Sequence, residues 1–163
     1  MRYALMRKFD ISNGKGIGVS LFVQGCHFHC KDCFNPETWD FSGGKEWTDE
    51  DLDRFISLSN KSYIQRISIL GGEPLCQENI DEVCNICKAA KQNNPDIVIW
   101  VYTGDNFENI NHEVLKYIDV LVDGRFIADK KDFNLKFRGS SNQRIIDVKK
   151  TLKTGKVVLY EVD

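Results

Sequence analysis

Three cysteines in one short segment are the most reactive feature of the sequence. Cys26, Cys30 and Cys33 lie in the stretch QGCHFHCKDCFNPETWDF, residues 24–41, and a pair of histidines lies between the first two cysteines. Thiolates are soft ligands that suit zinc and iron–sulfur clusters. The segment therefore indicates a metal site, and the number of thiolates bears on which metal it holds.

Two metal chemistries are compatible with this spacing. Structural zinc takes four ligands, so His27, His29 or a distant cysteine would have to join the three thiolates. Structural zinc ligands usually come in two pairs, whereas the sequence contains one cluster of ligands. A 4Fe–4S cluster held by three thiolates keeps one iron open, which a catalytic cluster needs in order to bind a ligand directly. The iron–sulfur interpretation is preferred, and zinc stays the alternative.

Composition narrows the class of protein. The formal net charge of −2 creates no field that would attract nucleic acid or a membrane surface, although residues 149–156 hold a mild cluster of lysines. The N-terminus MRYALMRKFD lacks the apolar run of a signal peptide, and no window approaches the roughly 18 apolar residues of a membrane span. We therefore expect a cytoplasmic protein, in which six cysteines favour metal or redox chemistry over disulfides.

Short apolar runs alternate with helical patterns along the chain. Thr48, with Asp51 three residues later, is typical of a helix N-terminus. The C-terminal part is ambiguous between strand and helix at its start, and residues 157–160 read as a strand. The periodicities predict strands over 17–24, 66–72, 96–104 and 118–124, and helices over 48–59, 78–94 and 111–117.

This alternation predicts an α/β fold with a parallel sheet and helices outside it. A closed barrel of eight strand–helix units normally needs about 250 residues. At about 30 residues per unit, this chain has room for about five. We expect an open partial (β/α) barrel of about five parallel units, formed by a single domain over residues 1–163.

Chemistry-bearing loops follow each of the expected strands. They are Gly25–Cys33, Gly71–Pro74, Thr103–Asp105 and Asp123–Arg125. Because the carboxyl ends of parallel strands meet at one edge of a sheet, we expect these loops to surround one site.

Two motifs carry a resemblance to a known superfamily. QGCHFHCKDC, directly after a strand, resembles the cluster loop of the radical S-adenosylmethionine (radical SAM) superfamily. GGEP at residues 71–74 resembles the superfamily motif whose backbone holds the methionyl amino group. Both motifs occur in the expected order and at strand ends.

Further segments narrow the resemblance. Residues 35–40 resemble the N-x-x-T-W that follows the cluster loop in activases of glycyl radical enzymes, and Asn13–Gly16 is similar to their glycine-rich loop. DVLVDGRF, residues 119–126, and FRGSSNQRIIDV, residues 137–148, resemble the anaerobic ribonucleoside-triphosphate reductase-activating proteins in particular. This resemblance covers essentially the whole chain.

The resemblance implies an activity, cofactors and a partner. Cys26, Cys30 and Cys33 would hold a 4Fe–4S cluster whose open iron binds S-adenosyl-L-methionine. One electron, from a donor such as flavodoxin, would give methionine and a 5′-deoxyadenosyl radical. That radical would take a hydrogen atom from a glycine of the anaerobic (class III) ribonucleoside-triphosphate reductase and leave a glycyl radical there. The alternatives are an activase of the formate-lyase type and a zinc-binding interaction module.

The resemblance also marks candidate site residues. Many relatives place an aromatic residue before the third cysteine, against the adenine, but this chain has Asp32 there, so Phe34 becomes the candidate for that contact. Asp123 and Arg125 lie where related activases place polar residues near the cofactor or the incoming glycine, with an ion pair as the alternative. The implied cofactor-binding residues are Asp32, Phe34, Gly71, Gly72, Glu73, Pro74 and Thr103.

Three further cysteines are expected to be structural or stay unassigned. Cys84 and Cys87 lie on the apolar stripe of the expected helix over 78–94, where cysteine behaves as a small hydrophobic residue. Cys76 lies nearby without an assigned role. Glu73 either orients the amino group of the cofactor or caps the following helix.

Overall fold

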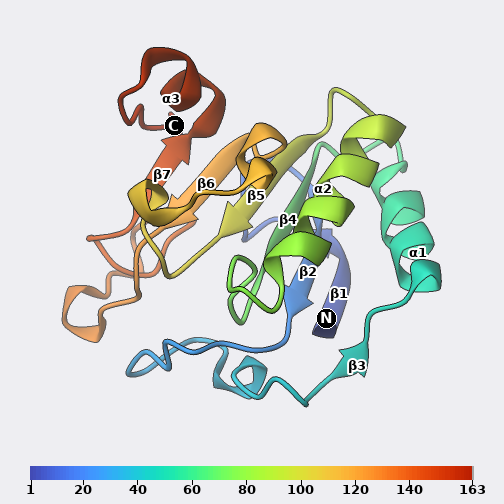
Figure 1. Ribbon diagram of the computed structural model, residues 1–163. Coiled ribbons are helices and arrows are strands. Elements are labelled where there is room, and N and C mark those ends of the chain that lie inside the picture. Colours follow the sequence, from blue (N-terminus) through green and yellow to red (C-terminus); the bar gives the residue numbers. More distant parts are fainter. Residues whose placement is uncertain (163) are drawn as a thin grey trace.

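The computed structural model describes residues 1–162 as an α/β fold built on one mixed sheet (Figure 1). The strand order is β3-β1-β2-β4-β5-β6-β7. The neighbours β2, β4, β5 and β6 are parallel, whereas β1, β3 and β7 run antiparallel to the strands beside them. The strands are β1 (Arg2–Asp10), β2 (Gly18–Val23), β3 (Lys45–Glu46), β4 (Arg66–Gly71), β5 (Val98–Tyr102), β6 (Val120–Asp123) and β7 (Arg144–Asp147).

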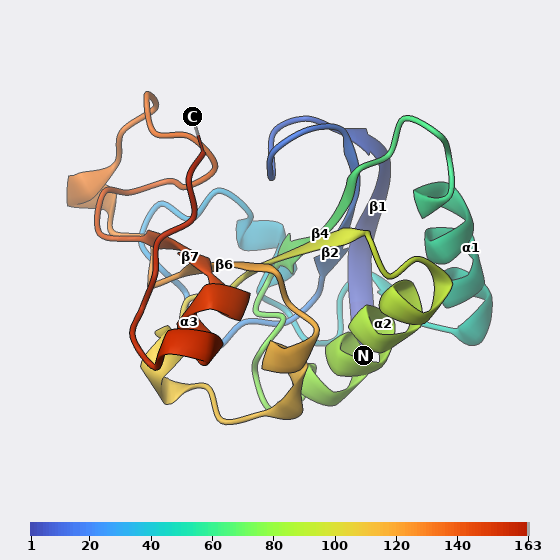
Figure 2. The same ribbon diagram turned by 90° about the horizontal axis from the view of Figure 1, so that it is seen from above.

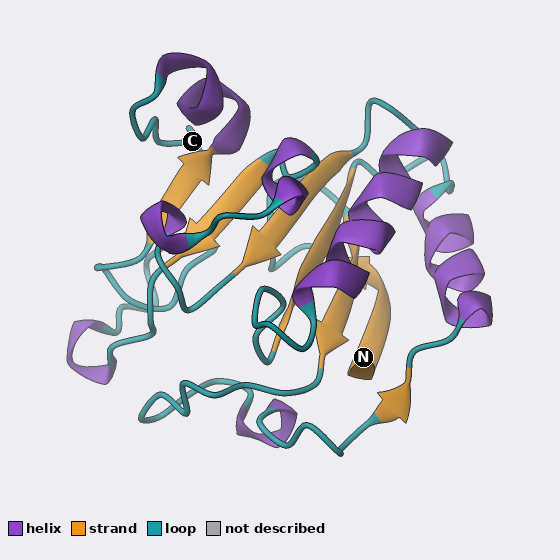
Figure 3. Cartoon of the chain, in the orientation of Figure 1, coloured by secondary structure: helices purple, strands orange, loops and turns teal. Residues whose placement is uncertain are grey.

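Helices and single 3₁₀ turns connect these strands (Figure 3). The expected capping box is confirmed, because Thr48 accepts a hydrogen bond from the Asp51 amide while the Asp51 carboxylate accepts one from the Thr48 amide. Within residues 1–162, no helix is long and apolar enough to cross a membrane. The helices are α1 (Asp49–Ser59), α2 (Ile80–Asn93) and α3 (Val148–Thr154), and the 3₁₀ turns are η1 (Pro36–Thr38), η2 (Phe107–Asn109), η3 (Glu113–Lys116) and η4 (Ala128–Lys130).

The two faces of the sheet are covered differently. Helices α1 and α2 lie against one face, and the loop of residues 11–17 lies on the other side (Figure 2). The larger core fills the space under the helices, with Ile67, Ile69 and Phe55 fully buried. A smaller core on the opposite face centres on Trp100, against which Phe137 and Tyr160 pack edge to face. Burial on both faces explains why the parallel strands read as continuous apolar runs.

The sequence predicted the four parallel strands but not the whole sheet. The sheet contains four parallel strands rather than about five. Residues 2–10 and 144–147 form antiparallel strands on either side of the parallel set. The helix expected over 111–117 is only the turn η3. Residues 157–160 run beside β7 with two backbone hydrogen bonds and one isolated bridge, and so do not form the predicted strand.

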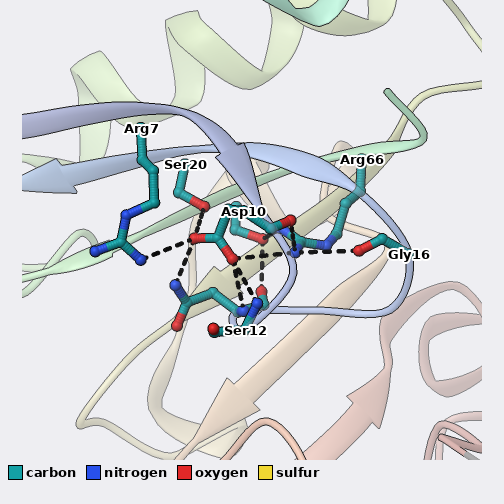
Figure 4. A network of polar contacts seen from close by, with 8 residues as sticks. Arg7, Asp10, Ser12, Gly16, Ser20 and Arg66 are labelled. Atoms are coloured by element: carbon teal, nitrogen blue, oxygen red, sulfur yellow. Dashed lines mark hydrogen bonds and ion pairs between the residues drawn. The ribbon is translucent and has the colours of Figure 1, made fainter. Parts of the chain in front are cut away.

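A buried ion pair fixes the loop of residues 11–17 at the amino end of the parallel strands (Figure 4). Arg66 begins β4 and is fully buried, and its guanidinium donates to the Asp10 carbonyl at 2.8 Å and to Ser68 Oγ at 2.6 Å. Asp10 accepts hydrogen bonds from the amides of Ser12 and Asn13 and from Ser20 Oγ. The chain thus closes its loop over a charged pair that has no contact with bulk water.

The same ion pair explains the glycine-rich loop. A Cβ atom on Gly14 would lie 2.6 Å from Arg66 Nε, and one on Gly18 would lie 2.6 Å from Arg66 Nη1. Real side chains do not tolerate such distances, so the backbone of these residues must pack directly on the guanidinium. This requirement accounts for glycine at both positions.

Candidate functional site

The loops at the carboxyl ends of β2, β4, β5 and β6 meet around one cavity, as the strand pattern predicted. In Figure 1 the loop after β2 passes below the arrowheads of these strands. The cavity is lined by Cys26, Phe28, Cys30, Cys33, Phe34, Asn35, Trp39, Leu70, Gly71, Gly72, Glu73, Tyr102, Thr103, Gly104, Gly124, Phe126 and Gln143.

All three cysteines of the loop after β2 line this cavity as free, half-buried thiols. The loop coils tightly, because His29 and Asp32 adopt positive φ values of 46° and 58° that side chains seldom accept. His29 stacks on Trp39 with ring centroids 4.5 Å apart. The Nε2 atom of His27 instead forms a hydrogen bond with Oε2 of Glu78 at 2.5 Å. Both histidines therefore have partners of their own beside the cysteine loop.

Backbone amides surround the three sulfur atoms. Burial raises the pKa of Cys26, while hydrogen bonds from the backbone of Phe28 and His29 act in the opposite direction. Burial likewise raises the pKa of Cys30, against a hydrogen bond from the backbone of Phe126. The Asn35 amide donates to Cys33 Sγ at 3.4 Å. Amide donors to sulfur stabilise thiolate ligands and tune iron–sulfur clusters, so the surroundings fit such a group.

The number of ligands near the thiols bears on the zinc alternative. Within residues 1–162, no group of three or more His, Cys, Asp or Glu side chains gathers around one metal-ion position. A structural zinc site closes four ligands on one ion, whereas a cuboidal cluster spreads its thiolates around several irons. The three thiols line one cavity, and the choice between the cluster and the zinc alternative stays a prediction.

The loop after β4 packs directly on the cysteine loop. The Gly72 amide donates to the Val23 carbonyl at 2.9 Å, and the Glu73 amide donates to the Gly25 carbonyl at 2.7 Å. A Cβ atom on Gly72 would lie 2.5 Å from the Gly25 carbonyl oxygen, and Gly71 has φ +109°. Both glycines are thus required by the close approach of two backbones, in addition to facing the cavity.

Glu73 ties the carboxyl ends of β4 and β5 together. Its carboxylate accepts hydrogen bonds from Thr103 Oγ1 at 2.7 Å, from the Gly104 amide at 2.6 Å and from the Leu75 amide at 2.9 Å. Within residues 1–162, no Lys, Arg or His forms an ion pair with it. Burial raises the pKa of Glu73 to about 7, although the three hydrogen bonds lower it. The cavity wall therefore holds an acid that titrates near neutral pH.

The other predicted residues divide into two groups. Phe34 and Thr103 line the cavity, and Phe34 meets Phe126 with ring centroids 4.9 Å apart. Asp32 and Pro74 lie outside the set of lining residues. Whether any of these residues contacts a cofactor stays a prediction.

Asp123 and Arg125 have separate partners. The buried Asp123 carboxylate accepts hydrogen bonds from Arg144 at 2.6 Å and from the Phe107 amide at 2.8 Å. The Arg125 guanidinium lies 4.6 Å from the ring centroid of Phe28. In the sequence, Phe28 lies between the first two cysteines of the loop. Arg125 therefore supports the cysteine loop from the end of β6.

Several lining residues were not singled out from the sequence. Gln143 donates to the Gly124 carbonyl at 3.0 Å and accepts from the Gly139 amide at 2.9 Å, so it joins two loops at the cavity. It lies in the segment FRGSSNQRIIDV, where the resemblance was its only signal. Tyr102, at the end of β5, and Trp39 also line the cavity.

Two of the remaining cysteines, Cys84 and Cys87, are core residues. Cys84 and Cys87 are buried in the larger core, and burial raises the pKa of both thiols. Cys76 is half-buried, and burial raises its pKa to about 11. The six cysteines thus fall into a cavity group and a group near or within helix α2.

One family model and several curated relatives match most of the chain. A family model described as a 4Fe-4S single cluster domain matches residues 12–146. A protein of Enterobacteria phage T4 is 38% identical over 146 residues, which cover 89% of this chain and 93% of the relative. One of Vibrio cholerae is 38% identical over 150 residues, covering 89% and 97%, and one of Salmonella typhi is 39% identical over 148 residues, covering 88% and 96%. All three are named anaerobic ribonucleoside-triphosphate reductase-activating protein.

Proposed function

We propose that this chain, which belongs to the family of anaerobic ribonucleoside-triphosphate reductase-activating proteins, activates such a reductase by radical chemistry. The observation that carries the proposal is the meeting of three cysteine thiols and the glycine loop after β4 in one cavity at the carboxyl ends of parallel strands. This is the end of a parallel sheet at which active sites lie.

Cys26, Cys30 and Cys33 are the proposed ligands of a 4Fe–4S cluster. With S-adenosyl-L-methionine bound beside it, that group would supply a 5′-deoxyadenosyl radical able to take a hydrogen atom from a glycine of the reductase. The chain's own contribution is placement and electrostatics. Amides of the cysteine loop and of Phe126 point at the sulfur atoms, and they stabilise the deprotonated thiols that ligation needs.

The loop after β4 is the proposed seat of the methionyl part of the cofactor. Gly71 and Gly72 expose backbone rather than side chain to the cavity, beside the cysteines. Glu73 holds this backbone in place through its bonds to Thr103 and Gly104. Phe34, half-exposed at the cavity wall and packed on Phe126, offers an apolar surface for the adenine.

A second hollow next to the cavity gives a protein substrate room to approach. It shares Phe34, Tyr102 and Gln143 with the cysteine cavity and has a volume of 670 Å³. Loop 11–17 lines it through Ser12 and Asn13, which the Asp10–Arg66 pair holds in place. We infer that the mixed sheet forms the open partial barrel of a radical SAM protein. We also propose that a flavodoxin-like donor reduces the cluster.

The test is a product assay with the complete system under anaerobic conditions. The chain is reconstituted with iron and sulfide, reduced, and mixed with S-adenosyl-L-methionine and the anaerobic reductase. We expect 5′-deoxyadenosine and methionine to form and nucleotide reduction to begin, with neither occurring for Cys30→Ala. Deoxyadenosine without nucleotide reduction would point to another glycyl radical enzyme, such as a formate-lyase type. Bound zinc and no cleavage would refute the proposal.

A further inference from the structure

A projecting segment beside the cavity has the features of a docking site. Residues 125–138, here called the arm, leave the body after β6 and return just before β7, and they extend away from the sheet in Figures 1 and 2. The sequence there is RFIADKKDFNLKFR. Only part of this segment is needed to join the two strands, whose register places Asp123 directly opposite Arg144.

The base of the arm is firmly packed. Phe137 meets Trp100 edge to face with centroids 5.3 Å apart, and the Ser141 amide donates to the Lys130 carbonyl at 2.9 Å. Lys131 forms an antiparallel bridge with Ser140. A Cβ atom on Gly139 would lie 2.5 Å from the Phe34 ring, so the returning chain presses on the cavity wall. An arm fixed at its base loses little conformational entropy when it binds.

The outer part of the arm, in contrast, presents apolar and basic side chains to solvent. Phe133 is 83% exposed, more than any other large apolar side chain in residues 1–162. Lys131 Nζ lies 4.6 Å from the Phe133 ring centroid and 5.4 Å from that of Phe34. An exposed aromatic residue beside a cation is the type of pair that forms the centre of protein interfaces.

The charge of the arm is opposite to that of the rest of the chain. The arm holds five basic residues and two acidic ones, a net charge of +3, whereas the whole chain has −2 and the remainder therefore has −5. A local field of this sign selects and steers an acidic partner surface. The five basic residues are Arg125, Lys130, Lys131, Lys136 and Arg138.

We propose that the arm docks the protein substrate, with Phe133 buried in an apolar pocket of the partner and Lys131 facing acidic side chains around it. Phe133 and Arg138 also line the hollow next to the cysteine cavity, so a partner held there presents its chain to the cavity. The inference rests on the proposed function, because it takes the partner to be the anaerobic reductase.

The test measures the dissociation constant between the reconstituted chain and the reductase by calorimetry. Phe133→Ala and Lys131→Glu should each raise it about tenfold. The matched control is Lys150→Glu on α3, an exposed lysine with the same charge change, which should alter it less than about twofold. Added salt should weaken wild-type binding more than binding of Lys131→Glu.

Stability and iron content accompany each binding measurement. Because Phe133 is exposed, Phe133→Ala should keep the wild-type unfolding midpoint and iron content, so a loss of affinity reports docking and not folding. Unchanged affinity in both arm variants would overturn the arm as docking site while the wild type still activates the reductase. Equal weakening by Lys150→Glu would overturn it as well. A wild-type chain that neither binds nor activates the reductase would instead remove the proposed function itself.

Discussion

The amino and carboxyl ends of the four parallel strands both bury ionisable side chains, but they treat the charge differently. At the amino end, Asp10 and Arg66 are 2% and 0% exposed and form an ion pair. At the carboxyl end, Glu73 is 4% exposed and receives three hydrogen bonds but no ion pair from residues 1–162. One end neutralises its buried charge, and the other leaves an acid without a counter-ion beside the cysteines.

The pKa values of the two acids reflect this difference. Burial raises the pKa of Asp10, but hydrogen bonds from Ser20, Asn13 and Ser12 outweigh it and hold the value at about 2. For Glu73 burial prevails, and the pKa is about 7. A perturbed acid in a cavity is typical of a functional site, whereas a fully paired one serves stability. The amino end thus holds the fold together while the carboxyl end remains available for ligands.

The largest expected effect separates the two groups of cysteines. Replacing Cys26, Cys30 or Cys33 by alanine should abolish incorporation of the cluster. The wild-type chain should contain about four irons after reconstitution. Cys84→Ala, on the buried side of α2, should retain the iron but lower the stability of the fold, because the substitution leaves a small cavity in the larger core. Iron and sulfide analysis after anaerobic reconstitution checks this. Iron retained by all three cavity variants would contradict the assignment.

The next largest effect lies at the amino end. Arg66→Met removes the buried ion-pair partner of Asp10 and should lower the free energy of unfolding by about 3–5 kcal/mol. Arg54→Met, which breaks the partly exposed pair with Asp51, is the matched control and should cost less than about 1 kcal/mol. Denaturant titrations of both variants give these values. A loss for Arg66→Met as small as that for Arg54→Met would show that the buried pair does not stabilise the fold.

Glu73 should make the ligand-free chain less stable as pH rises. Its pKa is about 7 in the folded protein against an ordinary 4.5, so between these values the folded state binds more protons than the unfolded state. Stability should therefore fall across this window, by about 3 kcal/mol in total. Glu73→Gln removes the titrating group, so the pH dependence of stability that comes from Glu73 should disappear even if the variant is more or less stable than the wild type at any one pH. Urea titrations from pH 4 to 8 compare the two slopes, and identical slopes would contradict the buried, unpaired state of Glu73.

A smaller effect should follow from removing one donor to this acid. Thr103→Val deletes the hydroxyl that donates to Glu73 and keeps the shape of the side chain. We expect a loss of about 1 kcal/mol at pH 8, where Glu73 is ionised, and less at pH 5, where it is protonated. Thr151→Val, which removes a hydroxyl far from the cavity, should show no such difference between the two pH values.

The sequence predicted local features better than distant pairings. Thr48 and Asp51 lie three residues apart, and their capping box follows from local chemistry alone. The parallel strands were visible because burial on both faces makes them continuous apolar runs. Strand β1 was missed because its apolar and charged residues do not alternate, and its partners are β2 and the distant β3.

The candidate site shows the same limit. The cysteine and glycine loops could be placed at one edge of the sheet because strand ends converge. The Asp10–Arg66 pair could not be foreseen, since the two residues are 56 positions apart and neither belongs to a local motif. The resemblance marked Asn13–Gly16, but only the structure shows Arg66 beneath Gly14 as the reason for a glycine there. The pairing of Asp123 with Arg144 could not be foreseen either, since these residues are 21 positions apart.

The most direct test of the proposed chemistry is electron paramagnetic resonance of the reductase after activation. The reduced, reconstituted chain is mixed with S-adenosyl-L-methionine and with reductase made from either ordinary or α-deuterated glycine. We expect a doublet on the reductase that collapses to a single line with the deuterated glycine and is absent with Cys30→Ala. A signal whose shape is unchanged by the deuterated glycine, or one that persists with Cys30→Ala, would contradict the assignment of the cysteine cavity as the source of a glycyl radical.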